Sequence, residues 1–420
     1  MLKVIFVSVF IIAVVFSAAA QGEQVRYREG LDITLSRTSV ITMITVYPGD
    51  QVYSVFGHSA FRVYDPENGI DWMYNYGTFD FTDDFFVLKF IEGKLDYYLD
   101  VDYFPRAFHF YTNVEQRKIY EQILNFNLEE RQALFDFLQK NAEPENRVYR
   151  YDFIWDNCST RIADAIDKTF PALIDYSAYR GTGESFRKMI MAYLEEKPFI
   201  NFGIQLVFGK PTDRIPKGHE IFFLPIYMKQ AFSAAIINNG EAETTPLVFA
   251  EAMIASPERT FQKKLDYPLF IFLSVLIIYF ISFVLQAGKN ILSNSNPAVL
   301  KLSGIVSAVC EGFVFLFTGI IGILITYLWF FSEHRVTSFN FTYLWCTPLN
   351  LILFIGVFLK TKSSFPKKLF ISLTFLSIIM CAAYLVCIAA GVQHAIPAFF
   401  PIIIFLIIAG GKKLIALWLC

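Results

Sequence analysis

Residues 151–168 read YDFIWDNCSTRIADAIDK and place a cysteine where a helix is expected to begin. Asp156 and Asn157 are residue types that cap helix starts well. Apolar side chains then recur at helical spacing, at Ile162, Ala165, Ile166 and Phe170. The pattern predicts a helix with Cys158 in its first turn. Three roles are open for this cysteine: a buried apolar filler, half of a disulfide, or a nucleophile.

The positions of the other cysteines narrow that choice. They lie at 310, 346, 381, 387 and 420, all within the apolar carboxy-terminal region. Cys158 therefore has no disulfide partner in its own polar part of the chain. A lone cysteine is often only a small buried side chain. At a helix start, however, unpaired N–H groups and the helix dipole stabilise an anion, so we expect a lowered thiol pKa and a nucleophile.

The composition indicates a membrane protein. The chain has 420 residues, is 55% hydrophobic and has a formal net charge of -2, which argues against a nucleic-acid partner. Residues 1–20 combine Lys3, an apolar run and a small-residue end at Ala20, the pattern of a cleaved signal peptide. An uncleaved membrane anchor is the alternative. In either case the segment that follows is exported.

The second part of the chain consists of apolar stretches separated by short polar loops. We predict transmembrane helices over 267–286, 306–331, 341–359, 369–390 and 395–410. The lysines between these stretches fall in the loops expected to be inside, whereas the outer loops carry Arg335 and no lysine. The domain prediction is a signal peptide over 1–20, an exported domain over 21–264 and a transmembrane domain over 265–420.

Within the exported domain, β-rich and helical patterns alternate. We predict strands at 33–47, 59–64 and 71–76, and a strand leading into a loop over 201–215. One or two helices are predicted over 115–140, and single helices at 158–170 and 184–194. The two strands at 59–64 and 71–76 are expected to form an antiparallel hairpin, because the residues between them include Pro66, Asn68 and Gly69.

A nucleophilic thiol needs a base, and three histidines precede the apolar region. His58 stands among small residues at the start of a predicted strand, where its imidazole can face an open cleft. His109 has aromatic neighbours and is interpreted as structural. His219 has no evident partner. His58 is therefore the candidate base for Cys158.

A strand histidine followed about 100 residues later by a helix-start cysteine resembles the circularly permuted papain-like enzymes, such as NlpC-type hydrolases and lecithin:retinol-acyltransferase-like proteins. GHSAFRVY and DNCSTRIAD are similar to the two halves of that motif. More of the chain resembles the Bacteroides-type lipoprotein N-acyltransferase family, Lnb, in this order: YSVFGHSAFRVYD, YNYGTFDF, FIEGKLDYYL, YRYDFIWDNCSTRIADAI, SFRKMI and NFGIQLVFGKPTDR. The resemblance implies an α+β, circularly permuted papain-like domain followed by an all-α transmembrane domain.

The same resemblance implies site residues. Cys158 and His58 carry over as a catalytic pair, but no histidine on the next strand supplies a third residue. Asn75 or Asp80 can orient His58, and Asn75 is preferred because it lies on the adjoining predicted strand. Asp80 and Asn157 remain candidates for an orienting or oxyanion role. Backbone N–H groups at the helix start are further oxyanion donors.

The implied reaction is acyl transfer through a Cys158 thioester, from a membrane phospholipid to the α-amino group of the lipidated N-terminal cysteine of an apolipoprotein. No cofactor or metal is expected. The resemblance implies a bacterial inner membrane protein with its catalytic domain in the periplasm. Two alternatives remain: a periplasmic cysteine peptidase or amidase acting on peptidoglycan or peptide, and a non-catalytic membrane sensor or binding protein.

Four further residues are candidates with an equally plain structural explanation. Tyr97 and Tyr98 lie in an aromatic stretch that either contacts lipid or packs in the core. Arg335 is a candidate for contact with phospholipid phosphate. Glu311 falls inside or beside the second predicted span, and an ionisable group there is either functional or interfacial.

Overall fold

A computed structural model describes residues 32–80, 82–238, 244–257, 262–287, 296–358 and 364–418. The predicted signal peptide lies outside the described residues. The chain divides into two compact units. The first contains the described residues up to Tyr193 and those of the stretch Ile215–Phe261, and the second contains Leu194–Arg214 and the described residues from Gln262 onward.

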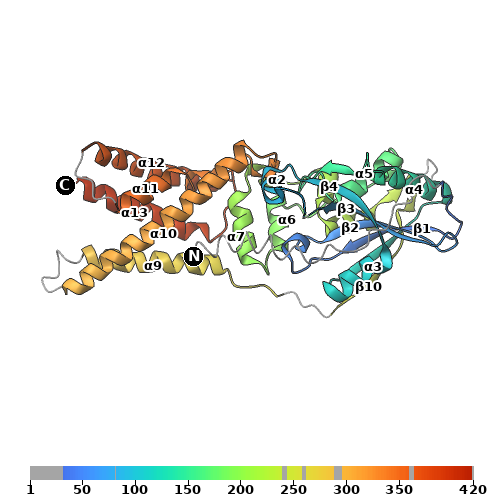
Figure 1. The fold of residues 1–420 in the computed structure, drawn as a ribbon, viewed down its shortest axis with the longest axis horizontal. Coiled ribbons are helices and arrows are strands. Elements are labelled where there is room, and N and C mark those ends of the chain that lie inside the picture. Colours follow the sequence, from blue (N-terminus) through green and yellow to red (C-terminus); the bar gives the residue numbers. More distant parts are fainter. Residues whose placement is uncertain are drawn as a thin grey trace. The chain divides into compact units, whose positions relative to one another are not determined.

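The first unit is built on a seven-stranded antiparallel sheet with the order β10-β5-β1-β2-β3-β4-β6. Strands β1 to β4 lie side by side in Figure 1. The strands are β1 (Val40–Val46), β2 (His58–Asp65), β3 (Ile70–Phe79), β4 (Asp96–Tyr103), β5 (Ile119–Leu124), β6 (Val148–Arg150) and β10 (Val248–Ala255). The predicted hairpin is confirmed, because β2 and β3 pair with Phe61 opposite Tyr74.

The core of this unit forms where helices α4 (Leu128–Ala142) and α5 (Thr160–Thr169) contribute apolar side chains to a cluster with the sheet. Leu134, Leu138, Ile162 and Ile166 are fully buried there. The start of α4 is fixed by a capping box, in which the Asn127 side chain accepts from the N–H of Glu130 and the Glu130 carboxylate accepts from the N–H of Asn127.

The remaining elements of the first unit are short. They are α2 (Phe86–Glu92), α3 (Phe104–His109), a π-helical turn (Phe110–Val114), α6 (Phe186–Tyr193), α8 (Pro225–Ala234), two 3-10 turns (Val52–Ser54 and Gly218–Phe223), and a small sheet of β7 (Ile174–Asp175), β8 (Ile236–Ile237) and β9 (Thr245–Pro246). Helix α6 agrees with the helix predicted at 184–194.

The prediction of one or two helices over 115–140 is wrong in its first half, because Ile119–Leu124 forms strand β5. The spacing of Ile119, Ile123 and Leu124 is compatible with one face of a helix and also with a short buried strand. Spacing alone therefore does not distinguish the two. Pairing decides it: β5 lies between β1 and β10 and hydrogen-bonds to both.

The second unit is helical. Its main helices are α9 (Tyr267–Ala287), α10 (Pro297–Phe330), α11 (Leu349–Phe358), α12 (Ser364–Ala389) and α13 (Phe399–Trp418), shown from yellow to red in Figure 1. Within the described residues, three helices are long and apolar enough to cross a membrane: Tyr267–Ala287, Pro297–Phe330 and Lys368–Ala389. The all-α class of this part is as predicted.

The span predicted at 341–359 is shorter in the structure. Phe341–Leu344 is a 3-10 turn, and α11 has 10 residues, a rise of roughly 15 Å against a hydrocarbon core of roughly 30 Å. The break follows from Pro348, which cannot donate a helical hydrogen bond. Helix α11 instead packs closely on α10, where a Cβ added at Gly319 would lie 2.6 Å from Leu351 Cγ.

The predicted strand at 201–215 is also wrong. Residues Pro198–Val207 form helix α7, followed by a 3-10 turn over Lys210–Asp213. This segment belongs to the helical unit, although we predicted it as part of the exported domain. The N–H of Gly209 donates to the Val336 carbonyl at 2.8 Å, and the Asn340 amide donates to the Leu206 carbonyl at 2.8 Å. Pro198 at the first helical position favours the helix start.

Candidate active site

Cys158 lies in the turn that opens α5, as the sequence predicts. The N–H of Arg161 donates to the Asn157 carbonyl at 3.0 Å, so the first helical hydrogen bond encloses Cys158. The Asn157 side-chain oxygen accepts from the N–H groups of Ser159 at 2.8 Å and Thr160 at 3.1 Å. Asn157 is therefore the residue that caps this helix.

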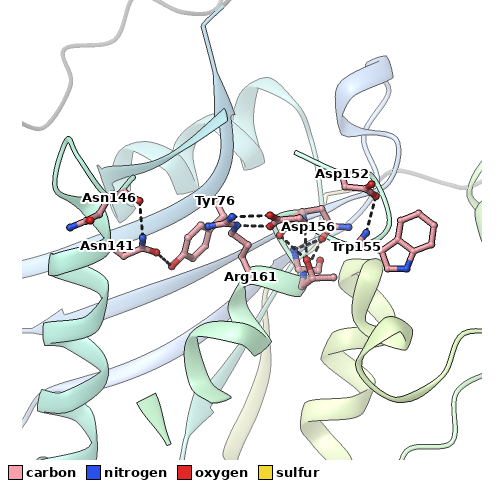
Figure 2. Close-up of polar contacts among 10 residues, drawn as sticks. Tyr76, Asn141, Asn146, Asp152, Trp155, Asp156 and Arg161 are labelled. Carbon is pink, nitrogen blue, oxygen red and sulfur yellow. Dashed lines mark hydrogen bonds and ion pairs between the residues drawn. The ribbon is translucent and has the colours of Figure 1, made fainter. Parts of the chain in front are cut away.

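The turn before Cys158 is held by charged and polar side chains, which Figure 2 shows. The Arg161 guanidinium binds Asp156 through two hydrogen bonds of 2.5 and 2.8 Å. The Asp152 carboxylate accepts from the N–H of Trp155 at 3.0 Å. These contacts fix the backbone on the amino-terminal side of Cys158, so its thiol has a defined position.

His58 is the first residue of β2, and its partner is Asn75 on β3. The distance from His58 Nε2 to Asn75 Oδ1 is 3.1 Å. The Asn75 Nδ2 donates to the Met73 carbonyl at 3.3 Å, which turns its oxygen toward the imidazole. With Nε2–H donating to Asn75, the Nδ1 nitrogen of His58 keeps a free lone pair.

Asp80 does not take this place. Its carboxylate accepts from the N–H and the hydroxyl of Thr82 at 2.8 and 2.7 Å, in the turn that follows β3. These two hydrogen bonds lower the pKa of Asp80. Of the two candidates for orienting His58, Asn75 makes the contact.

The cysteine turn and the histidine strand meet through neighbouring serines. Ser59 and Ser159 are fully buried, and their hydroxyl oxygens lie 3.2 Å apart. The N–H of Ser59, the residue after His58, lies close enough to the Cys158 sulfur to act against the rise in the pKa of the thiol. The structure thus brings the start of α5 against the start of β2, with Cys158 and His58 each adjacent to a contacting serine.

The ionisation of the pair differs from the sequence expectation. Burial raises the pKa of the Cys158 thiol, and hydrogen bonds from the Ser59 N–H and the Ser159 hydroxyl counteract this only in part. Burial also lowers the pKa of His58 from 6.5 to about 4, against the opposite effect of the Asn75 hydrogen bond. The expectation of a lowered thiol pKa was wrong, because desolvation outweighs the helix start. Both groups are neutral near pH 7.

Three tyrosines lie near the two candidate residues. The ring centroid of Tyr111 is 6.3 Å from that of His58, and Tyr149, Tyr151 and Cys158 lie around Gly77. Gly77, in β3 with φ +90°, leaves a small space among them: a Cβ there would lie 3.6 Å from the Cys158 Cβ and 3.5 Å from the Tyr151 ring. Sequence reasoning missed these residues, since aromatic positions alone do not separate a site wall from a core.

A cavity of about 270 Å³ opens beside the end of β1, where Val46 pairs with His58. Its lining is Tyr47, Pro48, Gln116, Arg117, Lys118, Ala192, Tyr193 and Ile226. Arg117 is buried and donates to the Tyr47 carbonyl at 2.6 Å and to Glu115 at 2.7 Å. The largely apolar wall suits an acyl or similar apolar group.

The other predicted contact residues lie in different settings. Tyr97 is buried, with its ring 4.4 Å from that of Tyr151, so it belongs to the core. Tyr98 is half-buried beneath Arg147, whose guanidinium lies 5.3 Å from its ring. Arg335 is exposed in the helical unit, in the turn Arg335–Thr337. Within the described ranges, no group of three or more His, Cys, Asp or Glu side chains is arranged to hold a metal ion.

Comparison with known proteins places both units in one family. Residues 28–181 match the Lnb N-terminal periplasmic domain, and residues 262–418 match the Lnb transmembrane domain. The chain belongs to the Lnb family. The Lnb periplasmic match contains Cys158, His58 and Asn75. No curated protein and no solved structure gives a match.

Membership in the Lnb family has a direct consequence. The chain is a membrane protein with a periplasmic domain, and it belongs among membrane enzymes that modify lipoproteins. The fold class is confirmed as α+β followed by an all-α helical region.

Proposed function

We propose that this Lnb protein is an inner-membrane apolipoprotein N-acyltransferase that uses Cys158 as its nucleophile and His58 as its general base. The observation that carries the proposal is the hydrogen bond from His58 to Asn75, which leaves Nδ1 free on a strand held against the Cys158 turn. A positioned base beside a thiol is the arrangement that covalent acyl transfer requires.

In the first step, Cys158 attacks the carbonyl carbon of a phospholipid acyl ester. Because both groups are neutral at rest, the thiol proton passes to His58 Nδ1 as the S–C bond forms. The ester C–O bond then breaks, and the imidazolium returns the proton to the departing lysophospholipid oxygen. The product of this step is an acyl thioester on Cys158.

In the second step, the free α-amino group of a diacylglyceryl N-terminal cysteine attacks the thioester carbon. His58 Nδ1 accepts the amine proton, the C–S bond breaks, and the proton returns to the sulfur. The amide is formed and the neutral thiol is regenerated. Asn75 holds the imidazole in one tautomer through both steps, a positioning role.

Exclusion of water separates this reaction from hydrolysis. The desolvation that raises the pKa of Cys158 and lowers that of His58 also keeps water from the thioester. The apolar cavity beside β1 is a suitable place for part of an acyl chain. These features favour acyl transfer over a peptidase or amidase, whose co-substrate is water.

The test uses the full-length protein in vesicles of phosphatidylethanolamine and phosphatidylglycerol with isotopically labelled acyl chains. A synthetic diacylglyceryl-cysteine peptide with a free amine serves as acceptor, and mass spectrometry follows the labelled acyl group. We expect a labelled thioester on Cys158, lysophospholipid, and a triacylated peptide. Cys158→Ala should form none of them, whereas Cys310→Ala should form all.

Three results would overturn parts of the proposal. Full activity of Cys158→Ala would remove the nucleophile assignment. Cleavage of peptidoglycan fragments without acyl transfer would support the peptidase. Absence of all turnover, together with Cys158 alkylation no faster than that of an ordinary thiol, would support a sensor. In cells, deletion of the gene should leave diacylated lipoprotein N-termini, restored by wild type but not by Cys158→Ser.

A further inference from the structure

The proposed reaction needs hydrogen-bond donors for the oxyanion that forms on the acyl carbonyl. The donors expected at the helix start are largely occupied. The N–H groups of Ser159 and Thr160 both donate to the Asn157 side chain. The Asn157 amide group donates to the carbonyls of Phe153 and Phe223 at 2.8 and 2.9 Å. Asn157 is therefore a cap and not an oxyanion donor.

The backbone N–H groups of Cys158 itself and of Ser59 also lie near the sulfur. Both lie on the sequence segments that meet at the site. A further oxyanion donor can come from another element of the fold. Strand β6, which carries Tyr149, supplies a candidate.

Tyr149 has a buried hydroxyl with no hydrogen-bond partner within the described residues. The residue is 8% exposed. Its oxygen lies 3.8 Å from the position that a Gly77 Cβ would occupy, and the Cys158 Cβ lies 3.6 Å from that same position. The unpaired hydroxyl thus borders the small space that Gly77 leaves open next to the thiol.

The ring of Tyr149 is held in place on two sides. The Tyr76 ring lies edge-on to it, with the two ring centroids 6.4 Å apart. The Arg161 guanidinium lies 3.5 Å from the centre of the Tyr149 ring. Arg161 is itself fixed by its ion pair with Asp156, which Figure 2 shows. A cation over the ring face draws electron density from the phenol, which strengthens its hydroxyl as a donor.

We propose that Tyr149 is a catalytic residue that donates its hydroxyl hydrogen to the oxyanion of the tetrahedral intermediate, together with the N–H of Cys158. This inference rests on the proposed acyltransfer function. As the S–C bond forms, the carbonyl π electrons move to oxygen, and the Tyr149 O–H bond stays intact. When the intermediate collapses, the C=O bond reforms, the leaving group departs with the proton from His58, and the hydrogen bond is released.

Two physical points support a donor and not a simple filler. Burial raises the pKa of Tyr149, so the hydroxyl keeps the proton it must share. An unpaired buried hydroxyl costs about 1–3 kcal/mol, whereas a phenylalanine would pack the same ring without that cost. The hydroxyl therefore stabilises nothing in the resting protein, and its favourable interaction arises when an oxyanion is present.

Tyr149→Phe tests the inference in the full-length protein, with the phospholipid vesicles described above. We expect thioester formation on Cys158 to slow by about 100-fold, the size of effect seen when one oxyanion donor is lost. Alkylation of Cys158 by iodoacetamide should keep its rate, because substitution at a saturated carbon forms no oxyanion. The unfolding temperature of Tyr149→Phe should equal that of the wild type or be higher.

Tyr76→Phe is the matched control. Its hydroxyl is already paired, because it donates to the Asn141 side-chain oxygen at 2.6 Å, as Figure 2 shows. This variant should form the thioester at the wild-type rate. A wild-type rate in Tyr149→Phe, with Cys158 still required, would overturn the Tyr149 inference alone. Equal losses of acylation and alkylation would also overturn it, since Tyr149 would then act on the thiol. Acylation that survives in Cys158→Ala would instead overturn the proposed function.

Discussion

The protein buries two polar clusters that are built in opposite ways. In the helical unit, the Glu311 carboxylate is 3.4 Å from Lys412 Nζ, 3.4 Å from Lys413 Nζ, and accepts from the Tyr279 hydroxyl at 3.0 Å. In the exported unit, Cys158 and His58 are neutral and the Tyr149 hydroxyl has no partner in the described chain. One cluster is charged and satisfied, and the other is neutral and incomplete.

The difference separates two uses of buried polarity. A satisfied ion cluster among helices adds specificity to their packing, because any rearrangement would leave a charge unpaired in apolar surroundings. Glu311 is 6% exposed and lies within α10, so it is a buried group with three polar partners. An incomplete cluster keeps binding capacity that only a reacting substrate fills.

His58→Ala has the largest expected effect on the neutral cluster. Removal of the general base should lower thioester formation by about 1,000-fold, within the range for general acid–base catalysis. The unfolding temperature should change little, because His58 makes one neutral hydrogen bond. The rate of thioester formation is measured by quenching the reaction at set times and quantifying the acyl-enzyme by mass spectrometry. A rate close to wild type would show that another group accepts the thiol proton.

Glu311→Ala tests the charged cluster. The substitution leaves Lys412 and Lys413 without their carboxylate, so we expect a loss of about 3–5 kcal/mol in the free energy of unfolding. Thermal unfolding in detergent measures this loss, and Glu311→Gln should lose less because the amide still accepts hydrogen bonds. Alkylation of Cys158 at low temperature should be unaffected. Unchanged stability in Glu311→Ala would mean that the cluster is solvated.

Asn75→Ala is a smaller perturbation of the neutral cluster. Loss of the hydrogen bond to His58 Nε2 should lower turnover by about tenfold, equivalent to one hydrogen bond of about 1.4 kcal/mol. Asn75→Asp should recover part of the rate, since a carboxylate also accepts from the imidazole. Asp80→Ala is the control, because its carboxylate bonds to Thr82. Equal losses in both alanine variants would contradict the orienting role of Asn75.

The smallest expected effect is on the pH dependence of stability. Burial lowers the pKa of His58 from 6.5 to about 4. Below pH 6.5 the unfolded chain therefore takes up a proton that the folded chain does not, and stability falls as the pH falls toward 4. We expect about 1 kcal/mol between pH 6.5 and 5.5. His58→Gln should flatten this dependence, and an unchanged slope would place the titration elsewhere.

Some elements of both units follow from the sequence, and others do not. The hairpin of β2 and β3, the helix that follows Cys158 and the helical carboxy-terminal region were all predicted from periodicity and turn residues. The apolar segment at 201–215 was misread as a strand, because a short apolar run looks the same in a buried helix. The ambiguity was resolved by packing, which local spacing does not encode.

The candidate site divides in the same way. Cys158, His58 and Asn75 were identified as candidates because their residue types, order and elements carry chemical meaning. Tyr149 was not, since one tyrosine among the chain's 22 has no local signal of its role. Its unpaired hydroxyl becomes visible only when β6, Gly77 and the Cys158 turn are brought together.

The sequence by itself determined the two-part organisation, the membrane character and the lone thiol at a helix start, because these depend on composition and local periodicity. Tertiary structure alone decided the ionisation of that thiol. The pKa of Cys158 depends on how much water the folded chain removes and on which N–H groups reach the sulfur. Here desolvation outweighs the helix start, so the thiol rests neutral, and its neighbours come from strands distant in the chain.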